Sequence, residues 1–523
     1  VYKRQLLLGL STIVRATGIV VLPAFLLIVL LDRPRQRRAI SALVLVISCL
    51  IVVLPVAKSF GDKFDSGLFL QGFGGLNFLL GNDPAGEGVP SARLGGDWDV
   101  VSGEAFRSGA LTAGARERYY YRQGLEQIRQ EPLGFVRMLV VKGFWLTQAE
   151  EPRETHSIHF FRTKSLLLRL LPGFGLLFPL SVCGLLVAGH SRRLPLSLSL
   201  YLLTIAGSCM LFVVSLRYRL PVVPVLAVFA GLAIIWFWSQ FQEKAWRKVV
   251  VWVTVFLVTA GVSQVWSHAP THNLAEEVAL SASSLERDGD LKRAESMYKE
   301  ALELDPQSAF AWAGLGRTYI RKNDLAAAEE AFRKSLEANP DYSRAHGGLG
   351  AVQWMTQRPS EAVESYRRAL WLSPDTGFIA RDLGKLLAQQ GQLEEALEVY
   401  EQFLLFDPND VPSLMAVARL SGALNAPHKG LDAVARATDL DPGNIDARAL
   451  YALLSSSSGD FAAADRALRA AESRVGTNDP RLLFAWSVVY GQQGREEEAN
   501  QMLARLIAEH PEFDPQRDLL MAH

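Results

Sequence analysis

Residues 309–340 read AFAWAGLGRTYIRKNDLAAAEEAFRKSLEANP, and this stretch decides the fold of the C-terminal half of the chain. Small residues recur in it at helical spacing, large apolar residues stand between them, and a proline closes it. The closing proline returns every 34 residues, as Pro306, Pro340, Pro374, Pro408 and Pro442. A period of this length indicates stacked helix pairs, because each pair can bury its apolar face only against its neighbours.

The positions inside the period agree with one known family. In the quoted unit the signature residues are Trp312, Leu315, Gly316, Tyr319, Ala328, Phe332 and Pro340. This pattern resembles the tetratricopeptide repeat. We expect about seven units within residues 275–513, starting near 275, 309, 343, 377, 411, 445 and 480. The aromatic stripe is then helix core and not a cofactor site.

A repeat array of this length predicts a concave groove that holds a peptide or a helix of a partner protein. The alternative is a spacer that only stiffens the assembly. Residues 268–523 carry 26 basic and 39 acidic side chains. That balance favours a basic protein partner and argues against nucleic acid.

The preceding part, residues 6–267, has the opposite charge balance, with 28 basic and 15 acidic side chains counted from residue 1. Residues 1–5, VYKRQ, look like a translated adaptor and are set aside. Apolar stretches of about the length of a bilayer span lie at 17–31, 39–57, 173–190, 195–215, 220–239 and 249–266. The sequence therefore predicts an all-α chain, a polytopic transmembrane helical domain followed by a tetratricopeptide-repeat α-solenoid.

Orientation follows from the basic residues in the short loops, which favour the cytoplasmic side. Such clusters lie at 33–38, 192–193 and 244–248. Strict alternation then places the long loop 58–172 and the repeats on the outer face. Arg15, Arg217 and Arg219 lie on that face too.

Paired guanidiniums at a membrane surface suit a lipid-linked phosphate, because each donates a forked pair of hydrogen bonds. The alternative is that these arginines reach for lipid headgroups. In the outer loop, residues 116–146 predict two helices broken near Pro132, the second lying in the interface with Trp145 at headgroup level. His156 and His159 have a spacing that a metal could use, but without a second pair we predict no metal site.

Four segments occur in an order that resembles a known enzyme group: GGLNFLLGNDP, YYYRQGLEQIRQEPLGFVRMLVVKGFWL, EEPRE with HFFR, and RYRLPVVPVLAVFAG. They look like the C-terminal portion of bacterial GT-C membrane glycosyltransferases, in particular the protein-mannosyltransferase-like group (glycosyltransferase family 39). The similarity covers roughly residues 6–240. It implies an inverting transferase in the bacterial cytoplasmic (inner) membrane that moves a sugar from a polyprenyl-phosphate donor to an extracytoplasmic acceptor.

The resemblance also implies roles for single residues. It assigns donor-phosphate contacts to Arg217, Tyr218 and Arg219, with Arg15 beside them, and substrate contacts to the loop residues Asn77 and Asn82. Ala16 follows Arg15 where relatives commonly have proline, which departs from the pattern. The catalytic carboxylate of such enzymes lies in an earlier loop, so no residue here is assigned as the base. No cofactor besides the lipid-linked donor is implied.

The sequence thus predicts a fragment of a membrane glycosyltransferase with a repeat domain for protein binding. Two alternative functions stay open. The chain can be a membrane-anchored tetratricopeptide scaffold without catalysis. It can also be a polymerase or ligase of lipid-linked oligosaccharides, a class that combines many spans, a large outer loop and trailing repeats. Sugar, acceptor and repeat partner are not identified by the residues.

Overall fold

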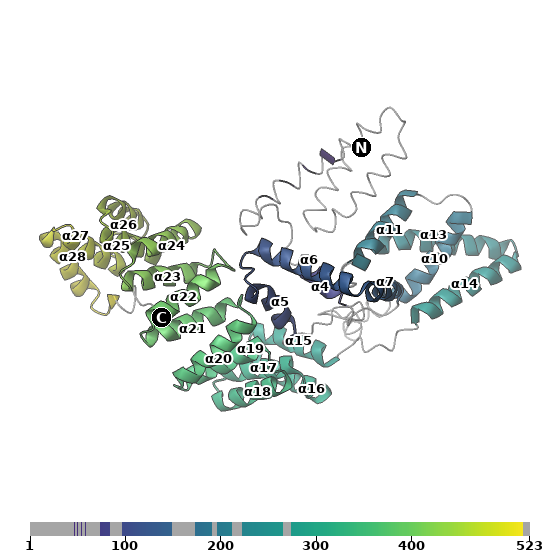
Figure 1. Ribbon diagram of the computed structural model, residues 1–523, viewed down its shortest axis with the longest axis horizontal. Coiled ribbons are helices and arrows are strands. Elements are labelled where there is room, and N and C mark those ends of the chain that lie inside the picture. Colours follow the sequence, from purple (N-terminus) through teal and green to yellow (C-terminus); the bar gives the residue numbers. More distant parts are fainter. Residues whose placement is uncertain are drawn as a thin grey trace. The chain divides into compact units, whose positions relative to one another are not determined.

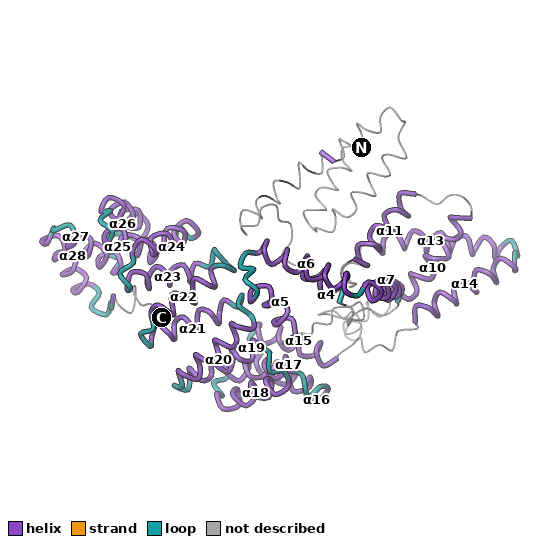
Figure 2. Tube along the Cα trace, viewed as in Figure 1, coloured by secondary structure: helices purple, strands orange, loops and turns teal. Residues whose placement is uncertain are grey.

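The computed structural model describes residues 74–83, 97–148, 173–190, 196–211, 222–264 and 274–515, and five isolated positions before residue 74. Within these ranges every regular element is helical and no strand occurs (Figure 2). The all-α prediction is confirmed for this part of the chain. The expected spans 17–31 and 39–57 lie outside it, apart from the isolated positions.

The chain divides into two compact units, Val1–Lys322 and Asn323–His523. The division falls between the two helices of one repeat. The domain boundary expected from the sequence, between residues 267 and 268, stays a prediction.

The first unit begins with helices from the predicted outer loop. They are α4 (Gly74–Gly81), α5 (Asp97–Arg107), α6 (Ala113–Gln130) and α7 (Pro132–Thr147). The break between α6 and α7 lies where Pro132 predicted it. Proline is tolerated at the first position of a helix because its missing N–H would have no partner there.

The face of α7 that carries Lys142 and Trp145 is turned into the protein. Both side chains are buried, and Trp145 is 1 % exposed. The helix packs on α11 (Leu196–Leu211), which covers this face. Trp145 is thus packed inside the protein, and the expectation that it lies at headgroup level stays a prediction.

Four apolar helices correspond to predicted spans: α10 (Phe174–His190), α11, α13 (Val223–Gln242) and α14 (Trp246–Gln264). Among the described residues, α13 and α14 are long and apolar enough to cross a membrane, with mean hydropathies of 1.8 and 1.4. The helix α10 is apolar but shorter. These two helices meet the length and composition of a membrane span, and the polytopic domain itself stays a prediction.

Close backbone contact joins α10 to α13. A β-carbon added to Gly184 would lie 1.8 Å from the carbonyl oxygen of Phe229, so only glycine fits at this crossing. The Ser181 hydroxyl donates a hydrogen bond to the carbonyl oxygen of Leu226, 2.8 Å away. The glycine at the crossing and the hydrogen bond between the helices bring α10 and α13 into close contact.

Seven helix pairs fill residues 274–515 (Figure 1). They are α15 (Leu274–Arg287) with α16 (Leu291–Leu304), α17 (Ala309–Arg321) with α18 (Leu325–Ala338), α19 (Ser343–Met355) with α20 (Pro359–Leu372), α21 (Gly377–Gln389) with α22 (Leu393–Leu404), α23 (Val411–Ala423) with α24 (Pro427–Leu440), α25 (Ile445–Ser457) with α26 (Phe461–Val475), and α27 (Pro480–Gln492) with α28 (Glu496–Glu509). Each first helix begins within one residue of the start expected from the sequence.

A left-handed residue turns the chain between the two helices of each pair. These positions are Gly289, Asn323, Gln357, Gly391, Asn425, Gly459 and Gly494, all with positive φ. Glycine and asparagine adopt this conformation with little strain, which explains their place after the first helix. The first six turn positions repeat with the 34-residue period of the prolines, and Gly494 follows Gly459 after 35 residues.

Aromatic rings pack directly against glycines inside the repeats. A β-carbon added to Gly348 would lie 2.2 Å from the ring of Phe332, and one added to Gly384 would lie 2.4 Å from the ring of Tyr400. The rings need this space because the paired helices approach closely. The aromatic stripe is core, as the sequence predicted.

Candidate functional site

Four of the predicted site residues, Arg15, Arg217, Tyr218 and Arg219, lie outside the described residues. The two loop asparagines are described. Asn77 is a half-buried residue of α4, and Asn82 follows that helix with 1 % of its surface exposed. The two asparagines thus differ in burial, although the sequence predicted the same role for both.

Asn82 is held by a contact with a buried lysine. The Nζ atom of Lys142, on α7, donates to Oδ1 of Asn82 at 3.2 Å and to the carbonyl oxygen of Met210 at 2.9 Å. The Nδ2 atom of Asn82 donates to the carbonyl oxygen of Phe78 at 2.8 Å. These bonds link α4, α7 and α11, so two segments of the transferase-like series meet in the fold.

Lys142 itself is fully buried. Burial disfavours its charged form and lowers its pKa to about 8. The side chain of Asn82 is used within the fold, and its assigned contact with substrate stays a prediction. Sequence reasoning missed Lys142 because a lone lysine in an apolar helix indicates an interfacial position.

The repeats present a second candidate on α21, where Phe378, Asp382 and Lys385 lie on one face at helical spacing. The Phe378 side chain is 50 % exposed. Lys385 is exposed and Asp382 half-buried. Aromatic side chains are enriched in protein-binding surfaces, so the exposed Phe378 makes this face of α21 a candidate binding surface.

Asp382 occupies a position that two other repeats give to glycine. The equivalent residues, 34 and 68 positions earlier, are Gly348 and Gly314, and each has an aromatic ring of the preceding repeat against it. The equivalent ring for Asp382 belongs to Tyr366. The fourth repeat therefore has an aspartate side chain next to a buried ring, where the second and third repeats have a glycine without a side chain.

The surroundings of Asp382 leave it without an internal partner. It has no hydrogen bond or ion pair with another described residue, and burial raises the pKa of its carboxyl. The Tyr366 hydroxyl is also buried without a hydrogen-bond partner among the described residues. Burial, and then the charge of Asp382, raise the pKa of that hydroxyl.

The nearby cations do not neutralise this carboxylate by contact. Arg381 donates from Nη1 to Oδ1 of Asp410 at 2.9 Å, which ties it to the next repeat. Lys385 forms no ion pair with a described residue. The signal for this site was in the sequence, since aligning the repeats shows an aspartate where the preceding two have glycine.

No group of three or more metal-ligating side chains gathers within the described ranges. His156 and His159 fall outside those ranges. The α21 face offers a half-buried carboxylate, an exposed aromatic ring and an exposed ammonium group.

Comparisons with known proteins concern the repeats. Family models described as tetratricopeptide repeat match residues 285–352, 382–410 and 482–512. None of the curated proteins compared with the chain matches it.

Three solved structures illustrate the similarity. YrrB, a tetratricopeptide-repeat protein with an unusual peptide-binding site, is 27 % identical, over 32 % of this chain and 87 % of its own, with a TM-score of 0.27. PilF of Pseudomonas aeruginosa is 19 % identical, over 40 % and 94 %, with a TM-score of 0.33. The C-terminal part of a repeat protein from Cytophaga hutchinsonii is 13 % identical, over 46 % and 98 %, with a TM-score of 0.37.

The matched segments lie in the first to third, the fourth and the last helix pair. The 34-residue period continues through the fifth and sixth pairs, which lie between the matched segments. The C-terminal part of this chain carries tetratricopeptide repeats.

Proposed function

We propose that the repeats bind a protein partner through the face of α21 that carries Phe378 and Asp382, and that the bound segment is basic. The observation behind the proposal is the half-buried Asp382 carboxylate without an internal partner. A desolvated charge costs stability unless an opposite charge meets it. A lysine or arginine of the partner supplies that charge and gains from the reduced dielectric around it.

The other features of the face fit the same partner. Phe378 offers an exposed aromatic ring, which packs against an apolar side chain or the stem of a basic one. The acidic excess of residues 268–523 attracts a basic chain at longer range.

A peptide selection tests this proposal. Twelve-residue peptides displayed on phage are selected on the full chain in nanodiscs, and the enriched peptides are then measured against Asp382→Asn. We expect enriched peptides to carry a basic residue beside an apolar one and to bind Asp382→Asn at least about tenfold more weakly, as for loss of one charged hydrogen bond.

Asp432→Asn is the matched control, because Asp432 is exposed on α24 and forms no bond with a described residue. It should bind the same peptides as the unchanged chain. Equal binding by all three proteins would exclude the α21 face as the binding site.

We also propose that this binding takes place outside the cytoplasm of a bacterial cell, at the inner membrane. Two helices, α13 and α14, support insertion into a membrane by their length and apolar composition. Basic residues where these two helices join, Lys244 between them and Arg247 in the first turn of α14, favour the cytoplasmic side. The segment after α14 then starts on the outer side.

A second candidate function concerns the N-terminal part, for which we propose sugar transfer from a polyprenyl-phosphate donor. One observation favours it over a bare anchor: the Lys142–Asn82 contact joins two segments of the transferase-like series at a buried site. A membrane anchor without catalysis does not require a buried lysine that links three helices, because burying a charged group costs free energy. The repeats would then hold an acceptor protein or an assembly partner.

Transfer of labelled sugar from a synthetic polyprenyl-phosphate donor tests this candidate in membranes that contain the full-length protein. Replacing both Arg217 and Arg219 by alanine should abolish transfer, because the guanidiniums stabilise the phosphate leaving group. Arg247→Ala, in the first turn of α14 and on the side predicted to be cytoplasmic, should transfer normally. Unchanged transfer by the Arg217/Arg219 variant would remove the assigned phosphate site.

A further inference from the structure

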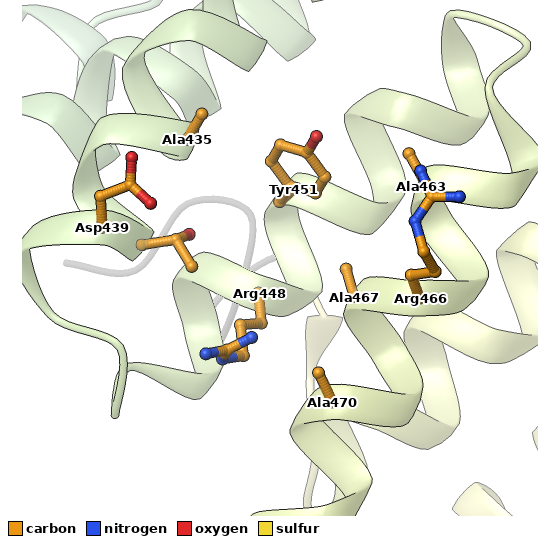
Figure 3. A pocket seen from close by; sticks show the side chains of 9 residues that line it. Ala435, Asp439, Arg448, Tyr451, Ala463, Arg466, Ala467 and Ala470 are labelled. Carbon is orange, nitrogen blue, oxygen red and sulfur yellow. The ribbon is translucent and has the colours of Figure 1, made fainter.

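A pocket of about 320 Å³ lies in the second unit between α24, α25 and α26 (Figure 3). Small side chains surround it, with Tyr451 among them, and charged side chains stand on its walls. The small residues are Ala435, Thr438, Ala463, Ala467 and Ala470, and the charged residues are Asp439, Arg448 and Arg466. A pocket of this size accommodates one or two amino-acid side chains.

The pocket exists because an ion pair found in the two preceding grooves is missing here. Glu401 and Lys429 join the second helices of the fourth and fifth repeats, with 2.6 Å between Oε1 and Nζ. One repeat earlier, Arg367 and Glu395 form the same kind of bridge. The residues 34 positions after Glu401 and Lys429 are Ala435 and Ala463, so both side chains that would fill the groove are absent.

Two charged side chains at the pocket form no ion pair or hydrogen bond within the part of the chain that the structure describes. Asp439 on α24 and Arg466 on α26 are exposed, and neither forms a hydrogen bond or ion pair with a described residue. In Figure 3 they stand on opposite sides of Tyr451. Arg448 differs from them, because its Nε and Nη2 atoms donate to the carbonyl oxygen of Pro442 at 3.2 and 3.0 Å.

We propose that this pocket is a second protein-binding site, separate in its residues from the α21 face. It takes a segment that has one basic and one acidic side chain on either side of a small apolar residue. The basic side chain meets Asp439, the acidic one meets Arg466, and the apolar residue lies on the alanines and Tyr451. The partner thereby contributes one basic and one acidic side chain to this groove, whereas in the two preceding grooves both come from the repeats themselves.

The exposure of the charged side chains at this pocket indicates which kind of ligand it binds. Asp439 and Arg466 are open to solvent, so the site suits side chains that reach in from a neighbouring protein surface. A fully enclosed small molecule would need buried polar groups around it. The alanines also let a partner backbone approach closely, because they project one carbon atom each.

The test uses the full chain in nanodiscs with 3-fluorotyrosine at position 451, observed by fluorine NMR. The probes are capped peptides at millimolar concentration that contain Lys-Ala-Glu, Glu-Ala-Lys, Lys-Ala-Lys or Glu-Ala-Glu. We expect the resonance of Tyr451 to shift with at least one of the mixed-charge peptides and with neither of the two single-charge peptides. No shift with a mixed-charge peptide, or equal shifts with all four peptides, would overturn the proposal.

Two variants make the result specific. Ala435→Glu with Ala463→Lys rebuilds the ion pair of the preceding groove, so the chain should fold normally and lose the peptide-induced shift. Asp439→Lys with Arg466→Glu reverses both walls and should exchange the preferences for Lys-Ala-Glu and Glu-Ala-Lys. A shift that persists in the rebuilt variant contradicts the proposal.

The readout reports this pocket alone, so it is independent of the α21 proposal. Phe378→Ala should leave the Tyr451 response unchanged. Conversely, the rebuilt variant should still bind the basic peptides selected on the α21 face. Failure of one site is therefore distinguishable from failure of the other.

Discussion

Single residues that depart from the repeat pattern carry most of the functional information in this chain. Asp382 replaces a glycine beside a buried ring, and Ala435 and Ala463 replace an ion pair. Gln357 replaces the glycine or asparagine of the turn. The first two changes leave an unpaired charge or an open space on the surface. The third lies in a turn and has a structural consequence only.

Gln357→Gly should stabilise the repeats by about 1 kcal/mol, because the left-handed conformation strains a residue with a β-carbon. Gln357 has a φ of 60°. The backbone bonds of the turn, from the N–H of Arg358 to the carbonyl oxygen of Gln353 at 2.8 Å, do not involve its side chain. Thermal unfolding followed by circular dichroism measures the gain.

Glu364→Gly serves as the opposite control, because Glu364 is exposed in the middle of α20. Glycine there should cost about 1 kcal/mol through lost helix propensity. If Gln357→Gly also lowered the unfolding midpoint, strain at the turn would not be the reason for the preference.

Asp382→Asn should stabilise the fold near neutral pH and change little in acid. Burial raises the pKa of Asp382 above its ordinary value of 3.8. The folded chain therefore favours the protonated carboxyl, and stability falls as the pH rises from the ordinary value through the raised one. Asparagine cannot ionise and escapes this loss.

The measurement compares unfolding midpoints of the variant and the unchanged chain at about pH 7 and at about pH 3. Asp432→Asn, at an exposed position, should show no such pH-dependent difference. A midpoint difference for Asp382→Asn that is as large in acid as at neutrality would mean that ionisation is not its cause.

At the scale of elements, the helices are set by local signals that are legible in the sequence. Prolines and left-handed turn residues recur with the repeat period, so the starts of all seven first helices were predictable within one residue. The placement of Trp145 was not predictable, because burial of its helix face depends on packing against α11. Periodicity predicts which residues share a face and not what covers that face.

Gly348→Ala should destabilise the repeats by about 1–3 kcal/mol, because the added carbon meets the Phe332 ring and the two helices must separate. Gly491→Ala, in α27, is the matched control. A β-carbon at Gly491 meets no atom within 4 Å, so alanine should stabilise by about 0.5–1 kcal/mol through helix propensity.

Chemical denaturation of both glycine variants checks the pair. Opposite signs support the packing of the ring on Gly348. If both substitutions stabilised the chain, the close approach of α19 to Phe332 would be contradicted.

At the scale of the whole molecule, the sequence separated a basic apolar part from an acidic repeat part. The repeats were predictable because their period is strict. The apolar part was less predictable, since its helices α10 and α11 are shorter than a usual membrane span. The contact of Lys142 with Asn82 joins residues 60 positions apart, and only tertiary packing brings them together.

Cysteine labelling tests the proposed orientation of the whole chain. After replacement of Cys49, Cys183 and Cys209, a cysteine is introduced in place of Asp432 or of Arg247. An impermeant maleimide applied to spheroplasts should label Asp432→Cys, and should label Arg247→Cys only after the membrane is opened. The reverse pattern would place the repeats in the cytoplasm.

The binding role of the α21 face is tested most directly by reversing one charge on each side of the interface. The dissociation constant of a selected basic peptide is measured for the unchanged chain and for Asp382→Lys, and again with the peptide's basic residue changed to glutamate. We predict that either change alone weakens binding at least about tenfold and that the two together restore most of it, as for a direct charge pair. Independent, additive losses would contradict a contact between Asp382 and the partner's cation.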